Sequence, residues 1–183
     1  MLRLSNSQKQ SLLEIARRSV EASLAIRPLG WTPEPGVPVW EQYGVFVSIH
    51  KHGELRGCIG RLQIDDTLVV ATAECAVSAA FADPRFHPMS LDELDVVTFE
   101  VSVLSPLEPI DDVGAVQVGT HGILIEKNGQ RGLLLPQVAT KYDWDRTEFL
   151  EQTSIKAGLE PDAWRSGATM SVFQPVVFEE GAV

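Results

Sequence analysis

The sequence GVFVSIHKHGELRGCIG, residues 44–60, decides the fold more than any other stretch of the chain. From Gly44 to His50 it is rich in β-branched and aromatic residues, and Leu55 to Ile59 follows a polar turn at Lys51–Glu54. Two such runs on either side of a glycine-containing turn predict a β-hairpin. We therefore expect a sheet to begin here.

A second hairpin is predicted from Gly122 to Leu135, because Asn128-Gly129 is a strong hairpin turn sequence. Each hairpin begins at a glycine, turns at a glycine and carries Arg-Gly on its second strand, as Arg56-Gly57 and Arg131-Gly132. One interpretation is an internal duplication of a strand-rich and helical unit. The alternative is that hairpins share turn chemistry, which alone produces such a match.

The N-terminal region predicts a helix at about residues 5–27. Ser5-x-x-Gln8 is a capping-box pattern, and apolar residues follow at helical spacing until Pro28. The stretch from Pro28 to Pro38 holds four prolines and two glycines, so we expect an extended loop there.

Further helices and strands follow along the chain, and their mixture predicts the α+β class. We expect a helix capped by Asp65 or Asp66 and ended by Asp83-Pro84, a turn capped by Ser90 and Glu93, a strand from Val96 to Leu104, a helix capped by Asp145 and Glu148, and an edge strand from Met170 to Phe178.

Length and composition favour one soluble domain spanning residues 1–183. The formal net charge of −10 argues against non-specific binding of nucleic acid or of an anionic membrane surface. No run of about 18 apolar residues suggests a membrane span, and the N-terminus has no apolar secretory signal. We therefore expect a cytoplasmic protein in which Cys58 and Cys75 are free thiols. The oligomeric state is left open.

The segment Leu55–Gly60 is the first candidate site. Arg56 and Cys58 are two residues apart on a predicted strand and so share a face, where a guanidinium favours the nucleophilic thiolate. Gly57 and Gly60 leave room for a substrate or for another backbone. The alternative is that Cys58 is a small apolar residue in the core of the sheet.

The register of the hairpin decides between these alternatives. A two-residue turn places Cys58 on the face of Val45, Val47 and Ile49, in a dry core. An odd-length loop moves it to the face of Ser48 and His50, where a base can reach it. The sequence is compatible with both.

Other candidates are weaker. Arg85 is the only cation between Leu62 and Asp112, among eleven acids, so it either binds a substrate anion or neutralises its acidic neighbours. His121, flanked by glycines before a strand, and Glu100, on the polar face of its strand, are candidate proton carriers. No metal-ligand spacing and no nucleotide-binding motif stands out, so neither a metal nor a cofactor is predicted.

The hexapeptide Leu55-Arg56-Gly57-Cys58-Ile59-Gly60 resembles the hallmark of the AMMECR-one family. Six further segments resemble this family in order and extend the resemblance from about Val45 to Phe178: Ala80-Phe81-x-Asp83-Pro84-Arg85-Phe86-x-Pro88, Glu100-x-Ser102-Val103-Leu104-Ser105-Pro106, Gly119-x-His121-Gly122, Leu134-Leu135-Pro136-x-Val138-Ala139, Trp144-Asp145 and Lys156-Ala157-Gly158-Leu159. The sequence departs from the expected pattern at Thr153-Ser154, where many relatives are expected to have a cysteine.

The resemblance implies an α+β fold with two repeated units around one barrel-like, mostly antiparallel sheet, and a cleft near Leu55–Gly60. It also implies partners, a Memo-like protein and a radical-SAM protein, beside which relatives are called AmmeMemoRadiSam system protein A. Two functions fit. One is a binding or accessory module for these partners. The other is a thiol-dependent enzyme with Cys58 as nucleophile or redox residue, Arg56 as activator, Arg85 as substrate anchor, and His121 or Glu100 moving protons.

Overall fold

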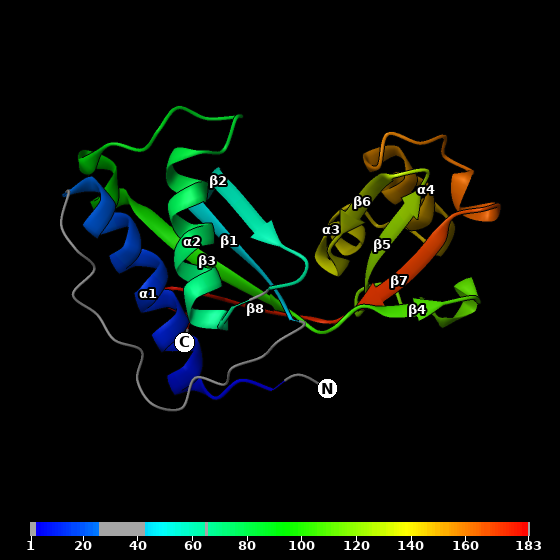
Figure 1. Cartoon of the computed structure of the whole chain (residues 1–183), viewed down its shortest axis with the longest axis horizontal. Helices are drawn as coiled ribbons and strands as arrows, with labels where there is room; N and C mark the ends of the chain where they lie inside the picture. The colour runs from blue at the N-terminus through cyan, green and yellow to red at the C-terminus, as the bar shows by residue number, and fades with distance from the viewer. Residues whose placement is uncertain (1–2, 26–42, 65, 183) are drawn as a thin grey trace. The chain divides into compact units, whose positions relative to one another are not determined.

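The computed structural model describes residues 3–25, 43–64 and 66–182 (Figure 1). The chain divides into two compact units. The larger contains the residues up to Leu104 together with those from Val176 onward, and the smaller runs from Ser105 to Pro175. The loop predicted at 28–38 and the proposed cap Asp65 lie outside the described residues.

The larger unit is a four-stranded sheet with two α-helices on one face (Figure 1). Its elements in chain order are α1 (Asn6–Leu24), β1 (Gly44–Lys51), β2 (Glu54–Arg61), α2 (Leu68–Phe81), the 3-10 helix η1 (Leu91–Val96), β3 (Val97–Leu104) and β8 (Pro175–Glu179). The strands lie in the order β2-β1-β3-β8. Alternate residues of β1 and β3 point at α1 and α2 and form the core with them: Val45, Val47, Ile49, Phe99, Val101 and Val103.

The two helices begin at side-chain caps. Ser5 and Gln8 form the predicted capping box of α1, and the described helix ends at Leu24. The cap of α2 differs from the prediction: Thr67, and not Asp66, accepts a hydrogen bond from the N–H of Val70. A threonine hydroxyl at the N-cap position accepts a hydrogen bond from a free backbone N–H of the first turn, as an aspartate carboxylate does.

The smaller unit has a second four-stranded sheet, with strands in the order β4-β7-β5-β6. Its elements are β4 (Glu108–Ile110), the 3-10 helix η2 (Val113–Ala115), β5 (Gly122–Lys127), β6 (Gln130–Leu134), α3 (Pro136–Lys141), α4 (Arg146–Lys156), the 3-10 helix η3 (Ala163–Arg165) and β7 (Thr169–Phe173). Ile123, Ile125, Phe149, Leu150 and Val172 lie at the centre of its own hydrophobic core.

The α+β class and the antiparallel pairing are confirmed. The described strands form two separate sheets and no closed barrel. The predicted edge strand at Met170–Phe178 is two strands: β7, inside the second sheet, and β8, at the edge of the first. Pro175 begins β8, a position that fits a residue without an N–H to donate.

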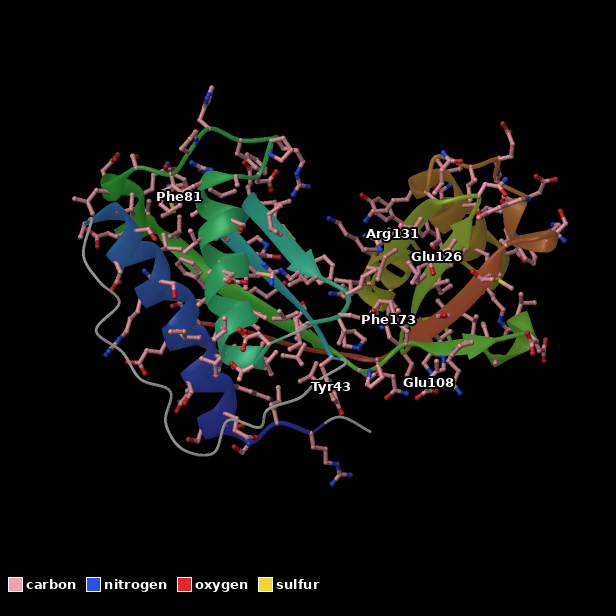
Figure 2. All side chains as sticks on the ribbon, in the orientation of Figure 1. Tyr43, Phe81, Glu108, Glu126, Arg131 and Phe173 are labelled. Atoms are coloured by element: carbon pink, nitrogen blue, oxygen red, sulfur yellow. The ribbon has the colours of Figure 1, made fainter. Side chains whose placement is uncertain are left out.

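The similarity between the two hairpins has a packing counterpart. A side chain on Gly57 would overlap the carbonyl oxygen of Ala79 in α2, and one on Gly132 would lie 2.7 Å from the carbonyl oxygen of Thr153 in α4. The ring of Phe173, labelled at the end of β7 in Figure 2, covers Gly122. Each Arg-Gly pair therefore lets a helix approach the backbone of the second strand of its hairpin.

Candidate functional site

The turn of the first hairpin has two residues, yet Cys58 does not enter the core. His52 and Gly53 adopt positive φ angles of 53° and 82°, and Lys51 pairs with Glu54. One residue further the register shifts, because Ile49 pairs with Gly57 while His50 pairs with Leu55. Arg56 is thus the extra residue of a β-bulge. Like an odd-length loop, the bulge moves the residues after it by one position, so that Cys58 shares a face with Ser48 and His50.

The bulge places Cys58 on the sheet face opposite α1 and α2. Cys58 pairs with Ser48, and paired residues share a face. Gly57, its neighbour, faces α2 instead, where the carbonyl oxygen of Ala79 fills the space beside it. The alternative that Cys58 lies in the hydrophobic core with Val45, Val47 and Ile49 is therefore wrong.

Three side chains form a row across β2, β1 and β3. The Ser48 hydroxyl donates a hydrogen bond to the sulfur of Cys58, with Oγ and Sγ 3.3 Å apart. On its other side Ser48 pairs directly with Glu100. All three side chains are half-buried. The sheet thus brings Glu100, one of the candidate proton carriers, to the residue that contacts Cys58.

The environment of Glu100 makes its carboxyl group harder to ionise than that of an exposed glutamate. Burial raises the pKa of the Glu100 carboxyl, the nearby His50 opposes this rise, and Glu179 adds to it. His50 lies on the same face of β1, two residues beyond Ser48. A carboxyl group with a raised pKa beside an imidazole can give up or accept a proton closer to neutral pH than an exposed glutamate can.

Arg56 is directed to Glu93, not to Cys58. Its guanidinium donates to both carboxylate oxygens of Glu93, at 2.9 and 3.0 Å, and to the carbonyl of His87 at 2.9 Å. Lys51 adds a third contact to Glu93 at 3.0 Å. The hydrogen bonds from Arg56 hold the pKa of the Glu93 carboxyl well below its usual range. Arg56 thus fastens η1 to the end of the hairpin.

Asp83 and Arg85 occupy the open edge of β2. The Asp83 carboxylate accepts from the backbone N–H of Cys58 at 2.9 Å, and Arg85 donates to the carbonyl of Cys58 at 3.2 Å. Arg85 also holds Asp83 through two hydrogen bonds of 2.9 and 2.7 Å, and these lower the pKa of the Asp83 carboxyl. Together they satisfy the N–H and the carbonyl of Cys58 at this edge, two groups that a further strand would otherwise pair.

This geometry bears on the three residues predicted to contact a substrate, Arg85, Gly57 and Gly60. Arg85 neutralises its acidic neighbour Asp83, the second of the two alternatives raised by the sequence. Its side chain is still 54% exposed, so anchoring a substrate stays a prediction. The ring of Phe46 covers Gly60, as α2 covers Gly57. Both glycines contact the protein itself at the position of the missing side chain.

His121 belongs to the smaller unit, whereas Cys58 belongs to the larger. Its Nδ1 accepts from the N–H of Gln117 at 3.3 Å, and its Nε2 lies 3.4 Å from Nε2 of Gln174. These contacts hold the ring at the start of β5. Its predicted role toward Cys58 stays a prediction.

The second thiol is structural. Cys75 in α2 is 1% exposed, and burial raises its pKa to about 11. Thr153 and Ser154, where a cysteine was expected by resemblance, are fully buried in α4, and their hydroxyls donate to the carbonyls of Phe149 and Leu150. Among the described residues, no group of three His, Cys, Asp or Glu side chains is placed to hold a metal ion. Within the same ranges, no helix is long and apolar enough to cross a bilayer.

Sequence reasoning missed the residues that position Cys58. In the sequence, Ser48 marks only one of the two registers, Asp83 indicates a helix stop and Glu93 indicates a helix cap. Glu93 does form the predicted capping box with Ser90 at the start of η1. Its second partner, Arg56, is 37 residues away along the chain, so the local pattern could not predict that contact. The Asp83–Arg85 pair is local, but the contacts of Glu93 with Arg56 and of Asp83 with the N–H of Cys58 become clear only when the hairpin and the loop after α2 are adjacent.

Comparison with known proteins gives the family. A family model described as AMMECR1 matches residues 13–178. The chain belongs to the AMMECR1 family. Among AMMECR1 relatives, a protein from Methanothermobacter thermautotrophicus is 42% identical over 185 residues, covering 97% of this chain and 96% of the relative. Another from Methanosarcina barkeri is 40% identical over 186 residues, covering 97% and 92%.

The AMMECR1 fold is also known from a solved structure. The crystal structure of an uncharacterized protein from Pyrococcus horikoshii is similar to this chain, with a TM-score of 0.88 and 37% sequence identity. The likeness covers 99% of this chain and 95% of that one, so it extends over both units.

Proposed function

We propose that this AMMECR1 protein is a cytoplasmic binding module that works with a Memo-like protein and a radical-SAM protein. Its binding surface is the sheet face that carries Ser48, Cys58 and Glu100. The observation that carries the proposal is the position of this row on three paired strands, opposite α1 and α2, where both neighbouring loops are fastened by buried acids. A site on paired strands holds its side chains in place before anything binds.

The chemistry of the row supports binding more than catalysis by this chain alone. Arg56, the predicted activator of the thiol, is engaged by Glu93 and His87. The Ser48 hydroxyl donates its proton in a hydrogen bond to the sulfur of Cys58, so in this arrangement it does not accept the proton of the thiol. The row offers a thiol, a hydroxyl and a carboxyl group within one patch, which suits recognition of a polar partner or substrate group.

A thiol-dependent enzyme is the second candidate, and one contact favours it. The Ser48 hydroxyl contacts the sulfur of Cys58, and Ser48 is paired on β3 with Glu100. If the hydroxyl rotates, so that it accepts the thiol proton and donates its own proton to the ionised Glu100 carboxylate, the thiol becomes a thiolate and Glu100 becomes neutral. The sulfur would then act as the nucleophile. In this reading His50, which acts electrostatically on Glu100, tunes the acceptor.

A titration of the purified chain with each of the two proposed partners tests the binding module. Ser48→Arg places a long cation on the row without touching the helix side of β1. We expect it to weaken binding at least about tenfold, since a mismatched charge in an interface costs more than about 1.4 kcal/mol. The matched control is Ser78→Arg, a serine-to-arginine change on α2. Absence of binding to both partners, or equal affinity of the two variants, would overturn the proposal.

Cys58→Ser separates the two candidates. A binding module keeps its affinity for the partners with a hydroxyl at this position and still supports the reaction of the assembled proteins. A thiol enzyme keeps the affinity but loses turnover, because serine at that position is a far weaker nucleophile. Turnover by the isolated wild-type chain, lost in Cys58→Ser, would contradict the module and establish the enzyme.

A further inference from the structure

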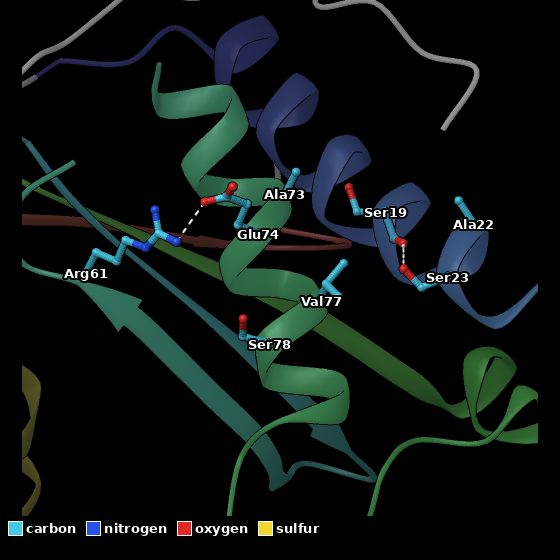
Figure 3. A pocket seen from close by; sticks show the side chains of 8 residues that line it. All are labelled: Ser19, Ala22, Ser23, Arg61, Ala73, Glu74, Val77 and Ser78. Carbon is cyan, nitrogen blue, oxygen red and sulfur yellow. Dashed lines mark hydrogen bonds and ion pairs between the residues drawn. The ribbon is translucent and has the colours of Figure 1, made fainter. Parts of the chain in front are cut away.

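A pocket of about 500 Å³ lies between α1 and α2, and its charged groups are paired within the chain (Figure 3). Arg61 and Glu74 form an ion pair of 2.7 Å at one side of it, and the Ser23 hydroxyl donates to the carbonyl of Ser19 at 2.9 Å. Because these groups already have partners, the pocket gives no indication of a ligand.

Three acids with little exposed surface are also paired with cations of the larger unit. An arginine binds each of them: Arg85 binds Asp83, Arg56 binds Glu93 and Arg17 binds Glu180. The side chains of these acids are 2%, 11% and 23% exposed, in that order. A carboxylate that is removed from water needs such partners, because burying an unpaired charge costs free energy.

Glu100 has no such partner. It is half-buried on β3, and among the described residues its carboxyl group forms no hydrogen bond and no ion pair. Its charged neighbours are Glu179 of β8, which repels it, and His50 of β1, which attracts it. Glu179 is exposed and, within the described ranges, its side chain is also without an ion pair. Two carboxylates thus lie near each other on this sheet face, and no arginine or lysine of the described chain pairs with them.

Apolar side chains flank the two carboxylates on the same face. Leu55 of β2 pairs with His50, so it shares this face, and it is 41% exposed. Val177 of β8 lies between Val176 and Phe178, which pack against the core on the helix side, so it points to the opposite face, where it is 38% exposed. Both α-helices of the larger unit pack on the other side of the sheet. Large apolar side chains on one exposed face are typical of a surface that binds another protein.

We propose that the partner protein places an arginine or lysine side chain against Glu100 and Glu179, and that apolar residues beside this cation contact Leu55 and Val177. The cation supplies the charge and the hydrogen-bond donors that both carboxylates lack within the described chain. The net charge of −10 also favours a basic partner surface, because opposite charges attract each other over long range. The location of this contact rests on the proposed function, and the chemistry of the partner's group goes beyond it.

A set of short peptides tests the charge directly. Acetyl-Leu-Arg-Leu-amide and acetyl-Leu-Lys-Leu-amide carry the proposed group, whereas acetyl-Leu-citrulline-Leu-amide has nearly the shape of the first and no charge. Binding to the whole chain is followed through the backbone amide signals of Ser48 and Cys58 in proton–nitrogen correlation spectra. We expect a basic peptide to shift these signals, and the citrulline peptide to bind at least about fivefold more weakly, because it lacks charge-assisted hydrogen bonds. The tighter of the two basic peptides shows which cation the face prefers.

Two variants test the carboxylates. Glu100→Gln and Glu179→Gln each remove one charge and keep the size of the side chain. We expect each to weaken binding of the basic peptide about three- to tenfold, the usual effect of losing one charge-assisted hydrogen bond. The control, Glu160→Gln at an exposed position of the smaller unit, binds as the wild type does. The proposal is overturned if neither basic peptide shifts the signals at about 20 mM, if the citrulline peptide binds equally well, or if both variants bind the basic peptide as the wild type does.

Titrations with the Memo-like and radical-SAM proteins separate this contact from the proposed function. If Ser48→Arg weakens a complex while Glu100→Gln and Glu179→Gln leave its affinity unchanged, the face is the binding surface but the partner's cation is not what it recognises. If neither protein binds and a basic peptide does, the proposed partners are wrong and the recognition of a cation is right.

Discussion

Cys58 and Cys75 show how two residues of one type acquire different chemistry from their surroundings. Cys58 is half-buried on the sheet face opposite α1 and α2 and contacts a hydroxyl, whereas Cys75 is enclosed between α2 and β1. Sequence alone left the position of Cys58 open, because both registers of the hairpin put alternating residues on a plausible core. The deciding residue, Arg56 at the bulge, carries no local signal for a bulge.

The two thiols should therefore differ in reactivity. At pH 8, a thiol whose pKa is about 11 is ionised in roughly one molecule in a thousand, and Cys75 is also 1% exposed. We expect one thiol per chain to react with Ellman's reagent in the native protein and two in denaturant. Mass spectrometry of the labelled peptide should locate the native label on Cys58. Two native thiols, or none, would refute this assignment.

Gly57 is a second residue whose role is spatial. Gly57→Ala places a methyl group against the carbonyl oxygen of Ala79, so β2 and α2 must separate or the bulge must move. We expect a loss of about 1–3 kcal/mol in the free energy of unfolding, the range for forcing an extra group into a packed site. Urea denaturation measures it. Glu54→Ala, at an exposed position in the same hairpin, serves as the control and should stay within about 0.5 kcal/mol of the wild type. A wild-type stability for Gly57→Ala would show that this contact is not tight.

At the scale of helices and strands, the sequence predicted what depends on neighbours along the chain. Ser5 with Gln8 and Asp145 with Glu148 form the expected capping boxes, and Asn128-Gly129 forms the expected turn. Contacts between distant segments were not predictable in this way. Arg56 and Glu93 are 37 residues apart, and Cys58 and Asp83 are 25 apart, so their pairing follows from packing of the loop after α2 against β2.

The Arg56–Glu93 ion pair should make stability depend on pH. The pKa of Glu93 is lower in the folded than in the unfolded chain, so its contribution is complete above about pH 5 and is lost as the pH falls through the folded-state value. Glu93→Gln removes this dependence and leaves the guanidinium of Arg56 without its charge partner. We expect a loss of about 2–3 kcal/mol at pH 7.

Denaturation at pH 7 and at pH 4 measures both effects. The stability lost between these pH values should be smaller in Glu93→Gln than in the wild type. The part that persists in the variant comes from other carboxylates with lowered pKa, Asp83 among them. An unchanged pH dependence would mean that Glu93 is not the group responsible.

At the scale of the whole molecule, the chain passes between the two units twice. The segment at Ser105 enters the smaller unit, and Gln174 leads from β7 back to β8, which completes the sheet of the larger unit. Ser105 and Gln174 exchange two hydrogen bonds, both 2.9 Å long. At the end of the chain, Glu180 binds Arg17 of α1 and the N–H of Phe99 in β3. The larger unit therefore needs the chain on both sides of the smaller one.

This connectivity predicts a single unfolding transition, as expected for one domain. Exposure of Cys75 to an alkylating reagent reports on the larger unit, and the indole signals of Trp144 and Trp164 report on the smaller. We expect the two probes to give the same midpoint in urea, because the larger unit cannot close without β8. Two separate midpoints would mean that the units fold independently.

The central claim is that the face carrying Ser48, Cys58 and Glu100 is the surface through which this protein engages its partners. The rate of Cys58 alkylation, measured with and without a saturating Memo-like protein from the same genome, tests it most directly. We predict that complex formation slows the alkylation of Cys58 at least about tenfold and leaves Cys75 as slow as before, because an interface excludes the reagent. A complex in which Cys58 reacts at its free rate, or the absence of any complex with both proposed partners, would contradict the claim.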